Sequence, residues 1–516
     1  MRLVRQVGLH PFLASAYPVL ALLAANAGQV RYSIVLRPLV LSLLGAAVLV
    51  GVLRWWLKDW IKAGMLATWL IVLFFGYGHL YNALRGVVLA GTTLGRHRFL
   101  VPAWALLALG GGWLIAQHRI DVRAGSRALN AVLVIALVFP LGQLAWPRNA
   151  GAAVLSGQEL ATQIRAQGMD LDSMPDIYYI ILDAYARADT LSESFDLDNS
   201  AFLEALGGLG FYVADCSQAN YAQTELTLAA ALNMDYVDRL VEQPLSEPDD
   251  RRRLWPLMRQ SMVRTGLEQS GYLSVAFETG YYWSEWEDAD LYLAPPTGWL
   301  AGMTAYEGTL LRSTAAWAAI DALPVLPPGL LRDLDRSTAA HRERVEFVLD
   351  QLAGMATRPG PKLVFVHLVS PHRPFVFDSQ GNPVEDDYTW TPSNLGLERY
   401  KSGYREQVRF LNTRLLPILE RLIADSDPAP VILLQSDHGP EEGAAVDRIR
   451  NLGAYFLGAV GQETLLPGIT PVNGFRAVFR SRFGLELPLL QDVSYFSTYD
   501  RPFEFTIIDE SCPAEG

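Results

Sequence analysis

Five apolar runs, each close to the length of a transmembrane helix, occupy the first 150 of the 516 residues. They cover residues 11–27, 35–53, 63–82, 99–117 and 128–146. A helix needs ~20 residues to cross the hydrocarbon core of a bilayer. The only acidic residues in this part, Asp59 and Asp121, fall between the runs. A buried helical domain would need acidic surface residues, so we expect a transmembrane region of about five helices over residues 1–146.

The charge of the chain divides at the same place. Residues 1–150 hold 14 basic and 2 acidic residues, whereas the remainder holds 28 basic and 52 acidic residues. Nucleic-acid binding needs a basic surface that neutralises phosphates, so the acidic remainder argues against that class of function.

The basic residues between the apolar runs indicate the topology. With the N-terminus inside, the inner segments carry eight basic residues and the outer segments carry six, which is the direction that the positive-inside rule favours. Five spans then place the acidic part outside the cytoplasm. The first run has an alternative interpretation as a cleaved signal, because Ala25-Asn26-Ala27 has the small-residue spacing of a cleavage site.

The rest of the chain has the pattern of an α/β domain, which we expect over residues 175–516, after a linker at 147–174. Short apolar runs that predict strands cover 177–182, 272–277, 363–367 and 431–435. Helical patterns lie between them at 200–209, 257–270, 340–354 and 404–424. This alternation predicts a largely parallel sheet with helices on both faces. Within the linker, residues 158–167 predict a short helix on the membrane surface.

Polar residues end or follow three of these strands. Asp183 follows 177–182, His367 ends 363–367, and Asp437-His438-Gly439 follows 431–435. Functional groups gather at the carboxyl ends of parallel strands, so one rim of the sheet can hold them all. A carboxylate and an imidazole that emerge from an apolar strand are costly unless they are paired or bind a metal. For Asp183 alone, a cap of the following turn is the structural alternative.

Thr224 opens a helix-like run that continues through Leu232. A threonine at such a place is usually a cap or a packing residue. A hydroxyl at a helix N-terminus also lies where backbone N–H groups favour an anion, such as a phosphate or a developing alkoxide. It becomes a nucleophile only when a base or a metal activates it. Two carboxylates, a hydroxyl and an imidazole suit one divalent ion, Zn²⁺ or Mn²⁺ before Mg²⁺.

Besides His438, the acidic part of the chain contains three histidines, His341, His367 and His372. His372 lies between Pro371 and Arg373, so we expect it on a loop near the rim, where it can bind phosphoryl oxygens or protonate a leaving group. We expect His367 to be a structural residue bonded by the backbone, and His341 to be exposed within a charged stretch.

Taken together, these residues resemble the alkaline phosphatase/sulfatase superfamily. More narrowly, they resemble its membrane-bound sulfatase-like transferases, the lipoteichoic acid synthases and phosphoethanolamine transferases. The resemblance implies an alkaline-phosphatase-like domain outside the inner membrane of a bacterial cell. It also implies Thr224 as nucleophile and His372 as a substrate-binding residue. The implied ligands of the one divalent metal are Asp183, Thr224, Asp437 and His438.

The chain departs from those families in specific ways. Asp183 stands where the transferases usually have Glu, and Ala184 follows it, so the paired aspartates of sulfatases are missing. The sulfatase nucleophile pattern Cys/Ser-x-Pro-x-Arg is absent around Cys216. No histidine follows His438, whereas enzymes with two metals need one there. One metal and phosphoester chemistry therefore fit better than sulfate ester hydrolysis.

The expected reaction moves a phospholipid-derived headgroup phosphate through a Thr224 ester to a hydroxyl of an envelope glycan or glycolipid. Two alternatives stay open: a phosphodiesterase or phosphatase with the same residues and water as acceptor, and an inactive envelope scaffold. The pattern does not identify the headgroup, the acceptor or the oligomeric state. An external domain permits a bridge between Cys216 and Cys512, although the sequence does not show that they meet.

Overall fold

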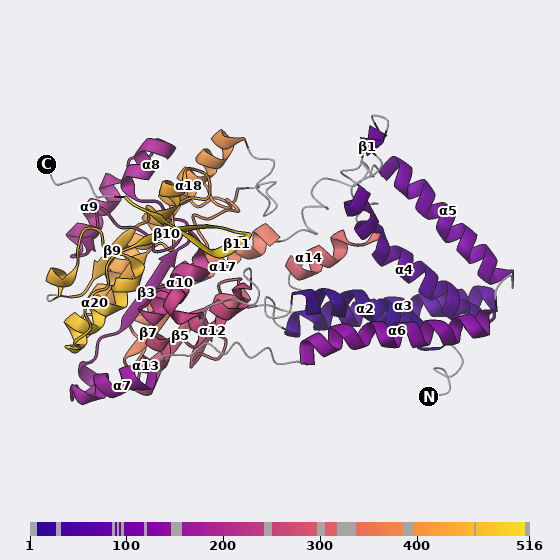
Figure 1. Cartoon of the computed structure of the whole chain (residues 1–516), viewed down its shortest axis with the longest axis horizontal. Coiled ribbons are helices and arrows are strands. Elements are labelled where there is room, and N and C mark those ends of the chain that lie inside the picture. The colour runs from indigo at the N-terminus through magenta and orange to yellow at the C-terminus, as the bar shows by residue number, and fades with distance from the viewer. Residues whose placement is uncertain are drawn as a thin grey trace. The chain divides into compact units, whose positions relative to one another are not determined.

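The computed structural model describes twelve segments of the chain. They are residues 8–26, 32–84, 88–89, 92–93, 97–117, 121–145, 157–241, 250–296, 305–316, 337–384, 396–458 and 461–510. The chain forms two compact units, a helical unit of residues 1–148 and 297–340, and an α/β unit of residues 149–296 and 341–516 (Figure 1). The segment 297–340 thus belongs to the helical unit, although it interrupts the α/β unit in sequence.

The helical unit is built from long apolar helices. They are α2 (His10–Ala25), α3 (Leu36–Leu57) after a short 3-10 turn (Tyr32–Val35), α4 (Trp60–Leu84), α5 (His97–Ala116) and α6 (Val122–Ala145), with a hairpin of β1 (Val88–Leu89) and β2 (Thr92–Thr93) between α4 and α5. Within the described residues, four helical segments are long and apolar enough to cross a membrane, at Tyr32–Leu57, Trp60–Leu84, His97–Ala116 and Val122–Leu144. Large apolar side chains such as Leu106 and Phe139 are exposed there, as lipid-facing residues are.

The first predicted run, 11–27, forms the shorter helix α2. Its 16 residues rise about 24 Å, slightly less than the hydrocarbon core. At its start, the buried His10 ring contacts Thr68 of α4 at 2.6 Å and Ser126 of α6 at 3.0 Å. Near its end, Leu23 packs in one apolar cluster with Leu144 of α6. Helix α2 therefore runs parallel to α6 along most of its length, which is the arrangement that a first span of five requires.

This arrangement predicts which helix ends share a side of the membrane. Single cysteines at Leu9 and Gln117, which flank α2 and α5, should resist a membrane-impermeant maleimide in spheroplasts, and one at Tyr32 should react. The reverse labelling pattern would invert the predicted orientation. Reaction at Leu9 with protection at Gln117 would mean that α2 does not cross.

A helix from the segment 297–340 packs within the helical unit. Helix α14 (Ala305–Arg312) contacts α2, and the hydroxyl of Tyr306 donates a hydrogen bond to the backbone oxygen of Val19. Its Glu307 carboxylate forms a two-point ion pair with the guanidinium of Arg37, and both side chains are largely covered. The pair neutralises a cation at the start of α3.

A seven-stranded sheet is the centre of the α/β unit. Its order is β4 (Tyr212–Val213), β9 (Gly453–Phe456), β8 (Val431–Gln435), β3 (Ile177–Leu182), β7 (Lys362–Leu368), β5 (Leu273–Phe277) and β6 (Leu291–Leu293). The strands from β8 to β6 in this order are parallel, whereas β9 pairs antiparallel with β8 and with β4. Apolar helices followed by an α/β domain with a largely parallel sheet confirm the predicted fold class.

Helices cover both faces of this sheet because neighbouring residues of β3 point to opposite sides. Ile177, Tyr179 and Ile181 pack in a core with α10 (Thr224–Asn233), α12 (Leu254–Arg259), α13 (Met262–Gln269) and α20 (Pro471–Phe483). Tyr178, Ile180 and Leu182 pack in a second core with α8 (Ala188–Phe195), α9 (Ser200–Gly208), α17 (Ser337–Leu352) and α18 (Leu397–Ala424).

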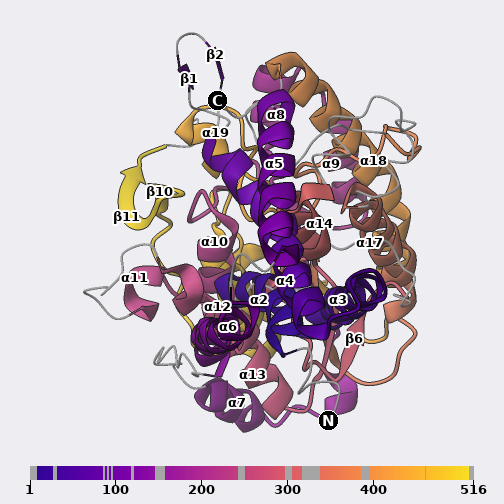
Figure 2. The ribbon, with the colours of Figure 1, turned by 90° about the vertical axis from the view of Figure 1, so that its right-hand side faces the viewer.

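The remaining elements lie at the edges of the α/β unit. They are the short helices α11 (Val237–Leu240) and α19 (Ala445–Ile449), and a hairpin of β10 (Ser494–Thr498) and β11 (Arg501–Ile508), seen at the edge of the unit in Figure 2. Helix α7 (Gly157–Ala166) packs against α13, with Leu160 and Ile164 buried and Arg165 bonded to the Gln269 backbone oxygen. The short helix predicted at 158–167 is therefore present, and its apolar face is covered by protein. Cys216 is disulfide-bonded, and Cys512 lies outside the described residues.

A buried ion pair lies at the amino ends of β3 and β7. The ammonium group of Lys362, which is 2% exposed, binds the carboxylate of Asp176 and donates to the Arg358 backbone oxygen at 2.9 Å. The same carboxylate accepts the Lys362 backbone N–H at 3.2 Å. Removal of one partner would leave the other charge buried without compensation.

We therefore expect Asp176→Asn to destabilise the α/β unit by about 3–5 kcal/mol, measured as the unfolding of the full chain in detergent. The double variant Asp176→Asn/Lys362→Met should recover most of that loss. Arg421→Gln, which removes an exposed pair with Asp425, is the control and should change stability little. Equal effects of Asp176→Asn and Arg421→Gln would contradict this account of the pair.

Candidate metal centre

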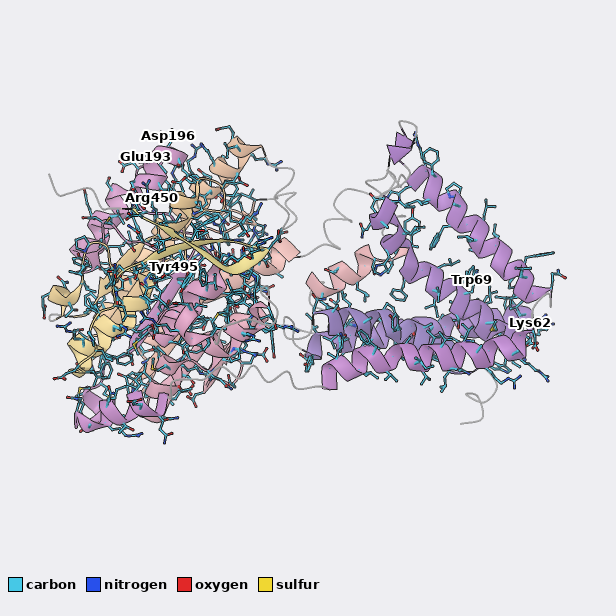
Figure 3. All side chains as sticks on the ribbon, viewed as in Figure 1. Lys62, Trp69, Glu193, Asp196, Arg450 and Tyr495 are labelled. Carbon is cyan, nitrogen blue, oxygen red and sulfur yellow. The ribbon has the colours of Figure 1, made fainter. Side chains whose placement is uncertain are left out.

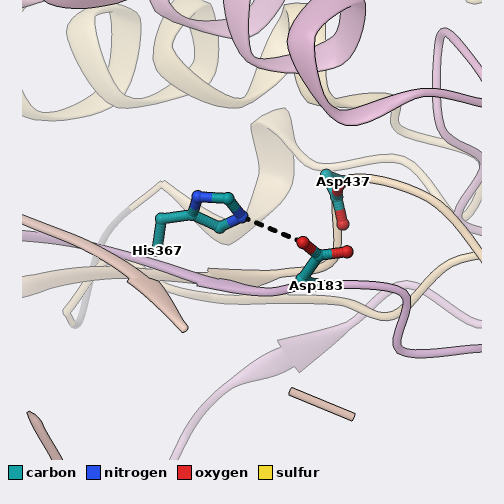
Figure 4. A group of neighbouring side chains, drawn as sticks. All are labelled: Asp183, His367 and Asp437. Atoms are coloured by element: carbon teal, nitrogen blue, oxygen red, sulfur yellow. Dashed lines mark ion pairs between the residues drawn. The ribbon is translucent and has the colours of Figure 1, made fainter. Parts of the chain in front are cut away.

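Three parallel strands deliver the polar side chains of the candidate site to one rim of the sheet. Asp183 directly follows β3, His367 lies near the end of β7, and Asp437 follows β8 (Figure 4). Ile181 of β3 is in register with His367 on one side and with Gln435 on the other. The residues that follow these positions therefore lie close together at the carboxyl ends of the three strands. The side chains of Asp183, His367 and Asp437 are at most 2% exposed.

The distances between these side chains are short. The Nε2 atom of His367 lies 3.3 Å from Asp183 Oδ2, the pair marked by the dashed line in Figure 4. His438 Nε2 lies 3.3 Å from Asp437 Oδ2 and 3.8 Å from Asp183 Oδ1. Asp183, His367 and Asp437 each offer a ligand atom, and these atoms lie within 4.8 Å of one another.

Several of these atoms have no hydrogen-bond partner among the described residues. They are Asp183 Oδ1, Asp437 Oδ2 and His367 Nε2. The other Asp437 oxygen accepts the backbone N–H of Ala184 at 3.0 Å, and Ala184 adopts a left-handed φ of 65° there. Buried carboxylate oxygens are costly without a partner, and a divalent cation would satisfy both. The donor set thus fits a metal ion.

Thr224 joins this group as the first residue of helix α10. Its Oγ1 atom lies 3.2 Å from His438 Nε2. The other ring nitrogen of His438, Nδ1, is 2.6 Å from the backbone oxygen of Gly439, which can only accept, so Nδ1 carries a proton. This leaves the lone pair of Nε2 directed at the Thr224 hydroxyl or at a metal. Such a backbone bond is how proteins orient ligating histidines.

His372 lies on the loop after β7, as its position between Pro371 and Arg373 predicts. Its backbone N–H donates to the Asp183 backbone oxygen at 3.0 Å, and its Nε2 atom lies 3.0 Å from Glu441 Oε1. Its Nδ1 atom lies 2.6 Å from the Arg373 backbone oxygen. Burial opposes protonation, but the charges of Asp183 and Glu441 outweigh it and raise the pKa of His372 to about 9.

Both ring N–H groups of His372 therefore donate to the protein itself. In this arrangement the ring contributes a positive charge beside Asp183 rather than a free donor. Glu441 also binds Arg373 at 2.5 Å. Burial opposes ionisation of the Glu441 carboxyl, but the hydrogen bond from His372 and the charges of His372 and Arg373 outweigh it and lower the pKa of Glu441 to about 2. Burial likewise opposes ionisation of Asp183, but the charges of His372 and His367 lower the pKa of its carboxyl.

Two histidines differ from the sequence expectations. His367 is not bonded by the backbone: its Nε2 faces Asp183, its Nδ1 lies 3.4 Å from Ser284 Oγ, and Tyr281 and Trp283 lie beside its ring. His341 is 2% exposed rather than on the surface, and burial lowers the pKa of His341 to about 3. The signal that points to His367 is a single histidine in a buried strand whose other residues after Lys362 are apolar. Glu441, three residues after His438, carried no signal of its own.

No family model matches the chain, and no curated protein sequence matches it. The structure is similar to solved structures at low identity. The C-terminal periplasmic domain of Escherichia coli EptC in complex with zinc aligns at 10% identity, over 65% of this chain and 92% of that one, with a TM-score of 0.41. The integral membrane protein lipooligosaccharide phosphoethanolamine transferase A of Neisseria meningitidis aligns at 11% identity, over 93% and 96%, with a TM-score of 0.37. The periplasmic domain of the phosphoethanolamine transferase EptC of Campylobacter jejuni aligns at 12% identity, over 62% and 92%, with a TM-score of 0.37. At such values the function of this chain has to be argued from its own site.

The geometry predicts the metal content of the purified protein. We expect one equivalent of a divalent metal by elemental mass spectrometry. Asp437→Asn should reduce metal affinity by at least the roughly 10–100-fold that loss of an outer-shell partner costs. Glu406→Gln on the partly exposed surface of α18 is the control and should retain the metal. Unchanged affinity in Asp437→Asn would place the metal elsewhere.

Proposed function

We propose that the chain is a membrane-anchored, metal-dependent phosphotransferase of the inner membrane. The observation that carries this proposal is the position of Thr224. Its hydroxyl lies at the N-terminus of α10, 3.2 Å from His438 Nε2, beside two buried carboxylates with unpartnered oxygens. A hydroxyl in such surroundings is suited to attack phosphorus, because a cation and a helix N-terminus both stabilise its alkoxide.

Asp183, Thr224, Asp437 and His438 would hold one divalent ion. The imidazole favours zinc or manganese over magnesium. When bound, the ion supplies positive charge that lowers the pKa of a hydroxyl and offsets negative charge on phosphoryl oxygens. Glu441 and His372 lie on the same rim and keep a charged pair next to Asp183.

The proposed reaction has two balanced steps. In the first, Thr224 Oγ1 bonds to the phosphorus of a phospholipid headgroup, and the bond from phosphorus to the diacylglycerol oxygen breaks. The Thr224 proton ends on the released diacylglycerol. In the second, an acceptor hydroxyl bonds to phosphorus, the bond to Thr224 breaks, and the acceptor proton ends on Thr224. We assign His372, held protonated by Glu441, to the binding of substrate, where its positive charge offsets negative charge on the phosphoryl group in both steps.

The helical unit supports a lipid donor. Four described helices have the length and composition of membrane spans, and α2 runs parallel to α6 beside them. An enzyme of soluble substrates would not need this unit. With five spans and the N-terminus inside, the α/β unit lies on the extracytoplasmic side, where hydroxyls of envelope glycans and glycolipids are the available acceptors.

Hydrolysis, with water in place of the acceptor, uses the same residues. The two activities differ only in the product, so analysis of the products with and without glycan acceptors separates them. An inactive scaffold would have no reason to retain two buried carboxylates that each keep one oxygen without a hydrogen bond among the described residues, since replacement by apolar residues would be more stable.

The phosphoester on Thr224 is the direct test. Purified protein incubated with mixed phospholipids and metal should show a headgroup-phosphate adduct on the Thr224 peptide by mass spectrometry. Thr224→Ala should lose the adduct and several orders of magnitude of activity. Thr413→Ala, an exposed threonine of α18, is the control and should keep both. Absence of the adduct in metal-loaded protein with unchanged lipids would exclude phospholipid transfer through Thr224.

A further inference from the structure

The tip of the β10–β11 hairpin carries an aromatic ring that the metal centre does not use. Tyr499 lies between β10 and β11 and is 77% exposed. Among the described residues of the α/β unit, it is the one aromatic side chain with such exposure. Its neighbours Thr498, Asp500 and Arg501 are exposed and polar. The ring is therefore exposed to solvent on a polar loop.

Arg251 covers one face of this ring. The guanidinium carbon lies 4.1 Å from the ring centroid, and the same group donates to the Tyr499 backbone oxygen at 2.8 Å. Arg251 is itself mostly buried, and it binds Glu225 Oε2 at 2.8 Å and Gln223 Oε1 at 2.5 Å. These two residues flank Thr224 in sequence, so one guanidinium fixes the ring to both neighbours of the proposed nucleophile.

Further bonds fix the hairpin to the loop before Thr224. Gln223 Nε2 donates to the backbone oxygen of Ser497 at 2.9 Å and to that of Thr498 at 3.2 Å. Tyr495 of β10, labelled in Figure 3, stacks on Tyr221 with a centroid distance of 5.5 Å. The Tyr499 ring is thus held in place before any ligand arrives, which reduces the entropic cost of binding.

The chain itself joins the ring to the metal centre. Arg251, which covers the ring, binds Gln223 and Glu225, and Thr224 between them lies 3.2 Å from His438 Nε2 through its Oγ1 atom.

We propose that the open face of Tyr499 is the sugar-stacking platform of an acceptor subsite. This inference rests on the proposed transferase function and adds the side chain that holds the sugar ring of its glycan or glycolipid acceptor. The negative face of an aromatic ring attracts weakly positive C–H groups, which line one face of a pyranose. Thr498, Asp500 and Arg501 supply donors and acceptors for the sugar hydroxyls. A tip that inserts into lipid would carry apolar residues at these positions instead.

The test uses the full chain in detergent, with methyl hexosides and methyl hexosaminides as probe acceptors. Tyr499→Ala should raise KM for the glycoside about tenfold or more, by analogy with the stacking energy of a ring on an aromatic side chain. It should weaken the acceptor step at least tenfold more than formation of the Thr224 adduct. Tyr499→Phe and Tyr499→Trp should restore the low KM. Ile507→Ala, an exposed position of the same hairpin, should leave every step unchanged.

Binding measured without turnover separates this inference from the proposed function. Saturation-transfer NMR should show contact of the glycosides with the wild-type protein, and the contact should disappear in Tyr499→Ala, even if no Thr224 adduct ever forms. Three results would overturn the platform: no glycoside binding to the wild type, equal binding by Tyr499→Ala, or an equal loss of both reaction steps. Loss of binding to phosphatidylethanolamine vesicles in Tyr499→Ala would instead assign the tip to the lipid surface.

Discussion

Asp183 and Asp437 end two adjacent parallel strands inside the α/β unit, and each keeps one buried oxygen without a hydrogen bond among the described residues. Such a pair is unfavourable by itself, because two negative charges repel and neither oxygen is solvated. The surrounding groups reduce this energetic cost. The cationic His372 lies beside Asp183, Ala184 adopts a left-handed conformation to donate to Asp437, and the lone pair of His438 faces the same point. A divalent ion would supply the charge that completes the arrangement.

The sequence was sufficient for the fold class because the relevant signals are local. Apolar runs of membrane length and buried strands that end in polar residues are visible in any single segment, and Asp183, Asp437 and His438 follow their strands as such a pattern predicts. Thr224 also opens its helix as expected. The parallel register then brings these residues to one rim, since Ile181 is level with both His367 and Gln435.

The remaining features depend on contacts between distant segments, which no local pattern encodes. His367 seemed structural because the sequence cannot show which side of β7 faces Asp183. The role of Glu441 depends on its contact with His372, which the fold brings to the loop after β8. Helix α7 has an amphipathic pattern that suits a membrane surface equally well, and its packing on α13 is visible only in the structure. The ties between the hairpin tip at Tyr499 and residues 223–225 join positions some 270 apart in the chain.

Anomalous diffraction from crystals of the metal-loaded protein tests the central claim most directly. We expect a single peak about 2.0–2.2 Å from Asp183 Oδ1, Asp437 Oδ2, His438 Nε2 and Thr224 Oγ1. A peak centred on His367 and away from Thr224 would contradict the assignment of Thr224 as the activated hydroxyl. No peak at this rim in protein that retains bound metal would contradict the metal centre as a whole.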